Sequence, residues 1–295
     1  MEKMEKIKLV VAMLIVGSIG IFVHYIPLPS AVIAGSRAII GTCFLLGTMA
    51  IQKTKVNWTA VRKNAGYLIL SGSAIGFNWI FLFEAYRYTS VAVATLCYYM
   101  APAFVVLAAP FVLKEKLTKT NLACTFAALF GAVLISGVFG SSQASLIGVG
   151  YGLAAAMLYA SIMILNKLCK GLSGLELTFF QLLVSAIVMV PYVLMTEDWS
   201  SITFSGQTIL LLVVVGVVHT GMVYQLFFSA LNQLPAQTSS LMSYIDPVTA
   251  IILSAVLLSQ PLSSIQLVGM IFILGSAVFN ELLTHYQRRV GQVIP

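Results

Sequence analysis

Long apolar runs alternate with short polar breaks along the whole chain. Each run has about 20 residues, the length that an α-helix needs to cross roughly 30 Å of hydrocarbon. The breaks are rich in Pro, Gly, Ser, Asn and Lys, which are typical of turns and helix ends. The pattern predicts ten transmembrane helices, over residues 7–25, 30–51, 65–87, 90–113, 119–139, 145–167, 174–195, 207–229, 236–258 and 263–284. We therefore expect an all-α integral membrane protein.

The composition agrees with this fold class. Of the 295 residues, 60% are hydrophobic and 8% are charged, whereas about 25% are charged in a typical soluble domain. The first apolar run follows basic residues, as in a signal peptide. No small-residue cleavage site before a polar region follows it, so we interpret the run as the first span.

The positions of the basic residues predict the orientation in the membrane. If the N-terminus is cytoplasmic, fourteen of the sixteen Lys and Arg residues fall in cytoplasmic segments, and only Arg37 and Arg87 do not. This positive-inside bias favours two cytoplasmic termini in a bacterial-type inner membrane. The net charge of +7 then reflects topology, and we expect no nucleic-acid partner.

The sequence contains an internal repeat with a shift of 145 residues. Tyr99-x-x-Pro102 matches Tyr244-x-x-Pro247, and several Phe, Ala and Leu residues also match. We expect one five-helix repeat in residues 1–140 and a second in 141–295. Because five is an odd number, the second repeat enters the membrane with inverted topology. Two such halves can exchange conformations, which is the basis of alternating access.

Several motifs resemble the EamA branch of the drug/metabolite transporter superfamily. They are Gly17-Ser18, Arg37, Pro102 and the run Lys114-Glu115-Lys116-Leu117-Thr118, and the resemblance covers essentially the whole chain. It implies ten helices in two repeats and a transporter, often an exporter of amino acids or related metabolites. Gln181 at the position matching Arg37, and Gln260 in place of an acidic residue, depart from the pattern and receive no role.

Charged residues inside a membrane segment are costly and therefore informative. Asp246 and His219 lie near the middles of the ninth and eighth spans, and are candidates for binding a proton or a substrate amine. The alternative is a structural ion pair or hydrogen bond between packed helices. Arg37 and Glu84 lie toward the outer ends of their spans, where they can form a gating pair or an ordinary interfacial salt bridge.

Aromatic residues gather at the same predicted depth. The repeat pairs Trp79 with Tyr224 and Tyr99 with Tyr244, and Asn78 is a neighbour. Aromatic faces attract ammonium groups and stack on flat rings, so the set suits an amine, an organic cation or an aromatic amino acid. The alternative is that these side chains only fill the bundle core.

These features predict a secondary-active transporter of a small metabolite, with export favoured. An importer of a choline-like cation, a lipid flippase and a non-transporting membrane protein are the alternatives. The GxSG string at Gly171–Gly174 lies at another depth than His219, which argues against a serine protease. There is no nucleotide-binding GxxxxGK[ST] motif. We expect no enzyme activity, cofactor or metal, and regard spans five and ten as candidates for a homodimer contact.

Overall fold

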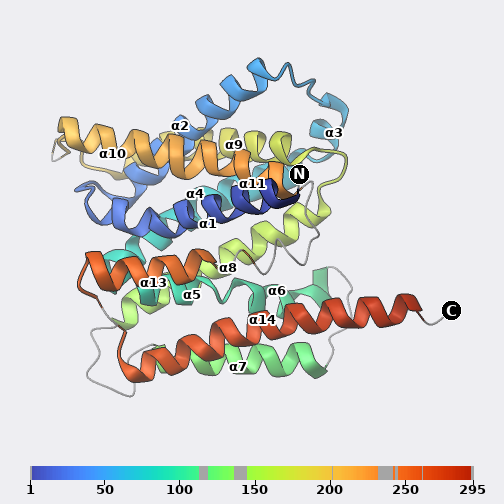
Figure 1. The fold of residues 1–295 in the computed structure, drawn as a ribbon. Coiled ribbons are helices and arrows are strands. Elements are labelled where there is room, and N and C mark those ends of the chain that lie inside the picture. Colours follow the sequence, from blue (N-terminus) through green and yellow to red (C-terminus); the bar gives the residue numbers. More distant parts are fainter. Residues whose placement is uncertain are drawn as a thin grey trace.

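The protein is a bundle of helices (Figure 1). In the part of the chain that the structure describes, seven helical segments are long and apolar enough to cross a membrane, and three further apolar segments are shorter. The structure, a computed structural model, describes residues 2–112, 119–135, 145–200, 202–231, 242, 245–260 and 262–293. The first half contains α1 (Glu2–His24), α2 (Ser30–Ile51), α3 (Trp58–Lys63), α4 (Ala65–Tyr88), α5 (Val91–Tyr98), α6 (Ala101–Val112) and α7 (Lys119–Ile135). The second contains α8 (Leu146–Leu168), α9 (Gly174–Thr196), α10 (Gly206–Gly216), the π-helix η1 (Val217–Met222), α11 (Val223–Leu231), α13 (Ile245–Leu257) and α14 (Ser264–Val293).

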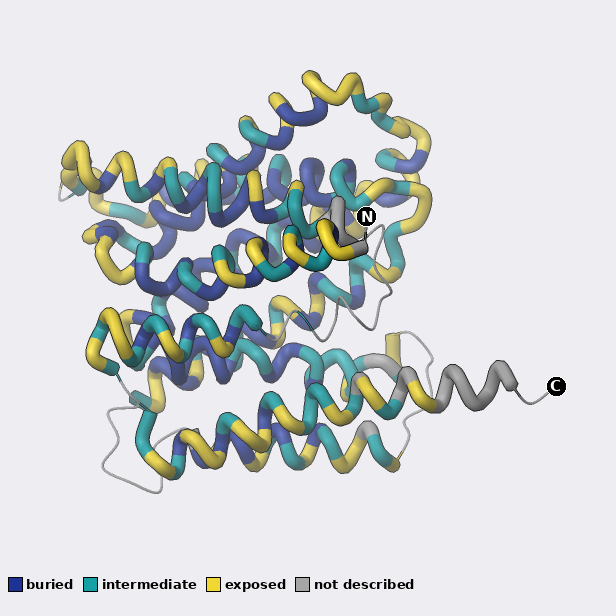
Figure 2. Tube along the Cα trace, in the orientation of Figure 1, coloured by how far each residue is buried: buried dark blue, intermediate teal, exposed yellow. Residues whose placement is uncertain are grey.

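The predicted fold class is confirmed. Apart from a break at Tyr99 and Met100 and a few end residues, the described part of each predicted span is helical. The second span begins and ends at the predicted residues, Ser30 and Ile51. Large apolar side chains such as Phe111 and Ile51, which are 86% and 84% exposed, cover the outside of the bundle. Figure 2 shows buried and exposed positions alternating along most helices. Exposed apolar surface of this kind is suited to lipid rather than to water.

Two predicted spans are interrupted, which the hydrophobic pattern did not indicate. The fourth span is divided into α5 and α6 at Tyr99 and Met100. Pro102 has no N–H to donate to the carbonyl of Tyr98, so the helix cannot continue regularly. The N–H of Met100 instead bonds the carbonyl of Cys97 at 3.1 Å. The eighth span contains η1 between α10 and α11.

The two halves run in opposite directions, as the predicted inverted repeat requires. In Figure 1, α1 runs from right to left and its counterpart α8 from left to right, and α7 and α14 differ in the same way. Equivalent contacts also recur. A Cβ at Gly76 of α4 would lie 2.7 Å from Cγ of Met189 in α9. The counterparts of these residues, 145 positions away, are Gly221 and Phe44, which are also in direct contact. The repeats therefore pack through matching positions.

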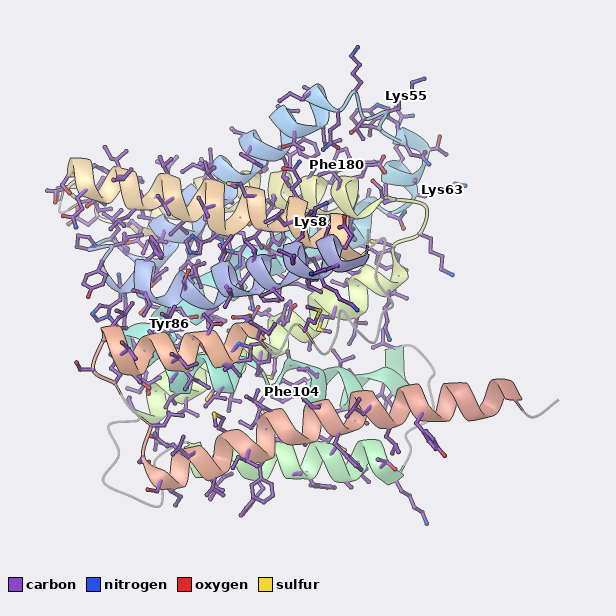
Figure 3. The ribbon with its side chains drawn as sticks, in the orientation of Figure 1. Lys8, Lys55, Lys63, Tyr86, Phe104 and Phe180 are labelled. Carbon is purple, nitrogen blue, oxygen red and sulfur yellow. The ribbon has the colours of Figure 1, made fainter. Side chains whose placement is uncertain are left out.

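One end of the bundle is basic. Lys55 and Lys63, with Lys8 nearer the middle, lie toward the end where α1 begins and α14 ends (Figures 1 and 3). On the basis of the positive-inside rule, we propose that this end is the cytoplasmic one.

The proposed orientation predicts the behaviour of reporter fusions. A green fluorescent protein fused to either terminus should fluoresce, and alkaline phosphatase at the same positions should be inactive, because both reporters would remain in the cytoplasm. An active phosphatase at the C-terminus would contradict the orientation.

Close glycine contacts between the halves predict a stability effect. A Cβ at Gly72 of α4 would lie 2.7 Å from the carbonyl oxygen of Gln181 and 2.7 Å from Cβ of Val184. Backbone atoms cannot move aside without a free-energy cost, so Gly72→Ala should lower the free energy of unfolding by about 1–3 kcal/mol. The melting temperature of the detergent-solubilised protein should fall by several degrees. Gly66→Ala, on the same helix with open space around it, is the control. Equal melting temperatures for the two variants would contradict this packing.

Candidate functional site

Arg37 is buried inside the bundle, with 7% of its surface exposed. Its Nε donates to Oγ1 of Thr220 at 2.7 Å, and its Nη2 donates to the carbonyl oxygen of His219 at 3.3 Å. The guanidinium carbon lies 4.0 Å above the ring of Trp79, a cation–π contact. Three groups on α4 and η1 thus hold the Arg37 side chain of α2 in one position.

The π-helix η1 provides the acceptors for Arg37. In its wider turns, Thr220 Oγ1 donates to the carbonyl of Val215 at 3.1 Å, and its oxygen is still able to accept from Arg37. Gly216 lets α2 approach closely, since a Cβ there would lie 2.5 Å from Cβ of Ile40. Short π-helical segments occur frequently at functional sites. His219 was predicted from its position in the sequence, but this local geometry was not.

His219 joins α1 to η1. Its Nε2 lies 3.0 Å from Oγ of Ser18, and its ring contacts Phe22 edge to face at 4.6 Å. The residue is 2% exposed, and the structure records no contact between it and Asp246 among the described residues. This is the hydrogen bond between packed helices that the structural alternative predicts for His219.

Asp246 lies in the first turn of α13, directly before Pro247. Its Oδ2 accepts a hydrogen bond from the hydroxyl of Tyr99 at 2.6 Å. A carboxylate in the first turn is stabilised by the helix dipole. The approach of α1 fixes this end of α13, because a Cβ at Gly17 would lie only 2.5 Å from the carbonyl oxygen of Asp246.

Several tyrosines lie near Arg37 or Asp246. Tyr98 stacks on Tyr159 with ring centroids 5.0 Å apart and meets Tyr99 edge to face at 6.4 Å. Tyr98 and Tyr86 are near enough to Arg37 to interact with it electrostatically. Tyr86 and Tyr159 were missed by the sequence analysis, because no repeat or charge pattern distinguishes them from other tyrosines.

The side chains of this group differ in exposure. Tyr159 has 39% of its surface accessible, whereas Tyr98, Tyr99 and Asp246 are half-buried.

The remaining predicted residues divide into three cases. Tyr224 interacts electrostatically with Arg37 and so belongs to the group. Asn78 is 2% exposed, and its amide donates to the carbonyl of Ala155 at 2.6 Å in the α4–α8 contact. Its Oδ1 also accepts from the hydroxyl of Tyr98 at 3.4 Å, so it contacts the tyrosine group as well. Tyr244 lies outside the described residues.

The predicted pair between Arg37 and Glu84 is not formed. Glu84 lies 3.7 Å from Arg87, one turn along the same helix, and Arg37 faces η1 instead. Helix rotation decides the partner here, and sequence position alone cannot determine it.

Arg37 and Asp246 share an unusual property. Among the residues that the structure describes, neither forms an ion pair, although Arg37 lies within a membrane-length helix and Asp246 in the apolar helix α13. Charges in this environment normally pair with one another or serve a function. In the same part of the chain, no group of three or more His, Cys, Asp or Glu side chains is placed to hold a metal ion.

The sequence matches a protein-family model in both halves of the chain. The model of the EamA-like transporter family matches residues 4–137 and again residues 146–281. The chain belongs to the EamA-like transporter family. This EamA-like protein is therefore a membrane transporter rather than an enzyme, and it contains two successive matches to the family model.

Relatives and a solved structure agree with the assignment. The uncharacterized transporter YxxF of Bacillus subtilis is 32% identical over 90% of this chain and 86% of its own length. Protein PecM of Dickeya dadantii is 27% identical over 75% of each chain. A protein of known crystal structure, 18% identical, has the same fold with a TM-score of 0.66 over 97% of this chain and 99% of its own.

The hydrogen bond from Arg37 to Thr220 predicts a measurable effect on stability. Thr220→Val keeps the side-chain shape but leaves the buried Nε of Arg37 without its acceptor, at a cost of about 1–3 kcal/mol. The melting temperature of the transporter should fall by several degrees. In the control Thr42→Val, the lost hydroxyl bonds only the carbonyl of Ala38 in its own helix. A Thr220→Val protein no less stable than the control would show that this bond does not hold Arg37.

Proposed function

We propose that the protein is a secondary-active transporter that moves a small amine-bearing metabolite, an amino acid, amine or organic cation, by alternating access. The observation that carries the proposal is Asp246, a carboxylate within a membrane helix that has a tyrosine partner but no cation among the described residues. Aromatic rings and a carboxylate together are suited to binding an ammonium group.

The composition of the site supports alternating access. Arg37, Trp79 and Tyr99 come from the first repeat, and Thr220 and Asp246 from the second. Movement of one repeat against the other would break or reform these contacts and change the side from which the site is reached. This is how inverted repeats operate in other transporters.

Proton coupling is a further part of the proposal. Asp246 is the stronger candidate, because it is partly accessible beside the tyrosines, whereas His219 is occupied by its bond to Ser18. Uptake measured with and without a pH gradient distinguishes a coupled from an uncoupled carrier.

Direction and assembly complete the proposal. We propose export across a bacterial inner membrane with both termini in the cytoplasm, in keeping with the family resemblance and the basic end of the bundle. The helices of spans five and ten, α7 and α14, pack against each other within one chain. Exposed apolar side chains on both, such as Phe126 and Ile271, face outward and are available for lipid or for a homodimer contact.

One observation bears on the flippase alternative. A groove of about 390 Å³ lies between α2 and α11, lined by Cys43, Phe44, Gly47, Thr48, Ile51, Gln52 and Gln225. An acyl chain could lie in such a groove. None of its lining residues is charged, however, and a phospholipid headgroup would need charged partners. The polar site around Arg37 and Asp246 therefore favours a small metabolite.

The proposed role of Asp246 is tested by flux into liposomes that contain the purified protein. Amino acids, polyamines and choline-like cations are compared as substrates. Saturable uptake of one class should fall about tenfold or more in Asp246→Asn, because the charged acceptor for the substrate ammonium group is lost. Uptake should also fall in Trp79→Ala. Asp198→Asn, in the exposed α9–α10 connection, should transport normally. Unchanged flux in Asp246→Asn would exclude this site.

A further inference from the structure

We propose that the protein binds one anionic phospholipid of the cytoplasmic leaflet, with an acyl chain in the groove between α2 and α11 and the headgroup at Lys53 and Lys55. This lipid is a resident ligand on the outer surface of the bundle and is not the transported substrate. The proposal therefore does not depend on what the protein transports. The groove, its polar end and the basic residues next to that end carry it.

The groove forms where α2 separates from the second half of the protein. In the middle of α2, Phe44 packs directly against Gly221 of η1. About one turn later, a Cβ at Gly47 would meet no neighbouring atom of the described residues within 4 Å. Figure 1 shows the end of α2 rising away from α11 toward α3. The resulting hollow of about 390 Å³ is within the usual range of about 300–1,000 Å³ for small-molecule sites.

The groove opens to the outside of the bundle, where the bilayer lies. Cys43, Gly47, Ile51 and Gln225 in its lining are all exposed. Cys43 and Gln52 are nine residues apart, so the groove follows α2 for about 14 Å at 1.5 Å per residue. One leaflet contributes about 15 Å to a hydrocarbon layer of about 30 Å. The length of the groove is therefore suited to one acyl chain of one leaflet.

Two amide side chains lie at the cytoplasmic half of this apolar lining. Gln52 directly follows the last residue of α2, and Gln225 lies in α11. Gln52 bonds through its backbone N–H to Thr48, and the described residues provide no recorded partner for either side-chain amide. Polar groups that face hydrocarbon are costly unless they are hydrogen-bonded. The ester and phosphate oxygens of a phospholipid would accept hydrogen bonds from these amides.

Basic residues continue the groove at the membrane surface. Lys53 comes directly after Gln52, Lys55 follows two residues later, and both are exposed. Neither forms an ion pair among the residues that the structure describes. Arg62 and Lys63 in the last turn of α3 are also exposed, and Lys55 and Lys63 lie at this end of the bundle in Figure 3. Positive charge beside an apolar groove is complementary to a phosphate group that carries acyl chains.

The position of the charges distinguishes a bound lipid from a transported one. The lining of the groove contains no charged residue, so a headgroup would find no counter-charge along it. Lys53 and Lys55 offer that counter-charge only at its end. Trp58, three residues after Lys55, is 60% exposed, and tryptophan favours the interface between membrane and water. The headgroup would therefore stay at the surface while the acyl chain occupies the groove.

A lipid in this groove would connect the two halves of the protein. Helix α2 belongs to the first repeat and α11 to the second. The lining includes Phe44, which packs on η1, and Gln225, which follows Tyr224. Tyr224 interacts electrostatically with Arg37. The lipid would support from outside the helices that hold Arg37, so we expect it to stabilise the folded protein.

The first experiment measures lipid binding to the full-length protein in detergent. Phosphatidylglycerol should raise the melting temperature at a concentration about tenfold or more below that needed for phosphatidylcholine, because only phosphatidylglycerol has a net negative charge. Native mass spectrometry should detect one retained phosphatidylglycerol per chain. Glycerol phosphate, which has the charge but no acyl chain, should have no effect. Equal potency of the two lipids, or of glycerol phosphate and phosphatidylglycerol, would overturn the proposal.

The second experiment fills the groove. Gly47→Leu places a side chain in open space, so the variant should fold but lose both the retained lipid and the rise in melting temperature with phosphatidylglycerol. Gly150→Leu, at an exposed glycine of α8 that also has open space around it, is the matched control and should keep both. Undiminished lipid retention in folded Gly47→Leu would overturn the proposal.

The third experiment removes the charges and decides the question even if Gly47→Leu is unstable. In the double variant Lys53→Gln, Lys55→Gln, phosphatidylglycerol should lose its advantage of about tenfold over phosphatidylcholine. The control Lys3→Gln, Lys119→Gln removes two exposed charges on α1 and α7 and should keep the preference. An unchanged preference in the Lys53, Lys55 variant would overturn the proposal. Because no flux is measured, that result would leave the proposed transport function in place.

Discussion

In the hydrocarbon of a bilayer, backbone N–H and C=O groups must find their partners within the protein. This requirement makes each span a helix and permits irregular backbone only where other protein groups or an internal opening can satisfy it. Both interruptions in the spans, at Tyr99–Met100 and in η1, lie at the candidate site. At η1, the carbonyl of His219 accepts from Arg37. The candidate site therefore lies where the regular helices are interrupted. It uses backbone groups at these interruptions, such as the carbonyl of His219.

The site is asymmetric although its scaffold is a repeat. Contacts such as Gly76 with Met189 recur between Gly221 and Phe44, so the two halves can exchange similar arrangements. Arg37 and Asp246 have neutral counterparts and do not follow the repeat. In the proposed function, the symmetry would permit the movement, and the two charges would contribute to selectivity. Such a division lets a common transporter architecture carry different substrates through a few substitutions.

Much of the fold was predictable because membrane insertion depends on local hydrophobicity, which can be read directly from the sequence. The spans, the inverted repeat and the presence of Asp246 and Trp79 in the interior followed from it. The π-helix was not predictable, since no residue preference marks it in Val217–Met222. The partner of Arg37 was predicted wrongly, because Glu84 and Thr220 are both reachable until the rotation of each helix is known. Tyr159 was missed because its role depends on contact between the two halves.

In the proposed function, Asp246 binds the amine of the substrate. An experimental structure of the transporter with a transported amine-bearing compound bound tests this most directly. The proposal predicts the ligand ammonium beside Asp246, whose Oδ2 accepts from Tyr99. A ligand bound away from Asp246, or an ion pair between Asp246 and a cationic side chain of the protein in the bound state, would contradict it.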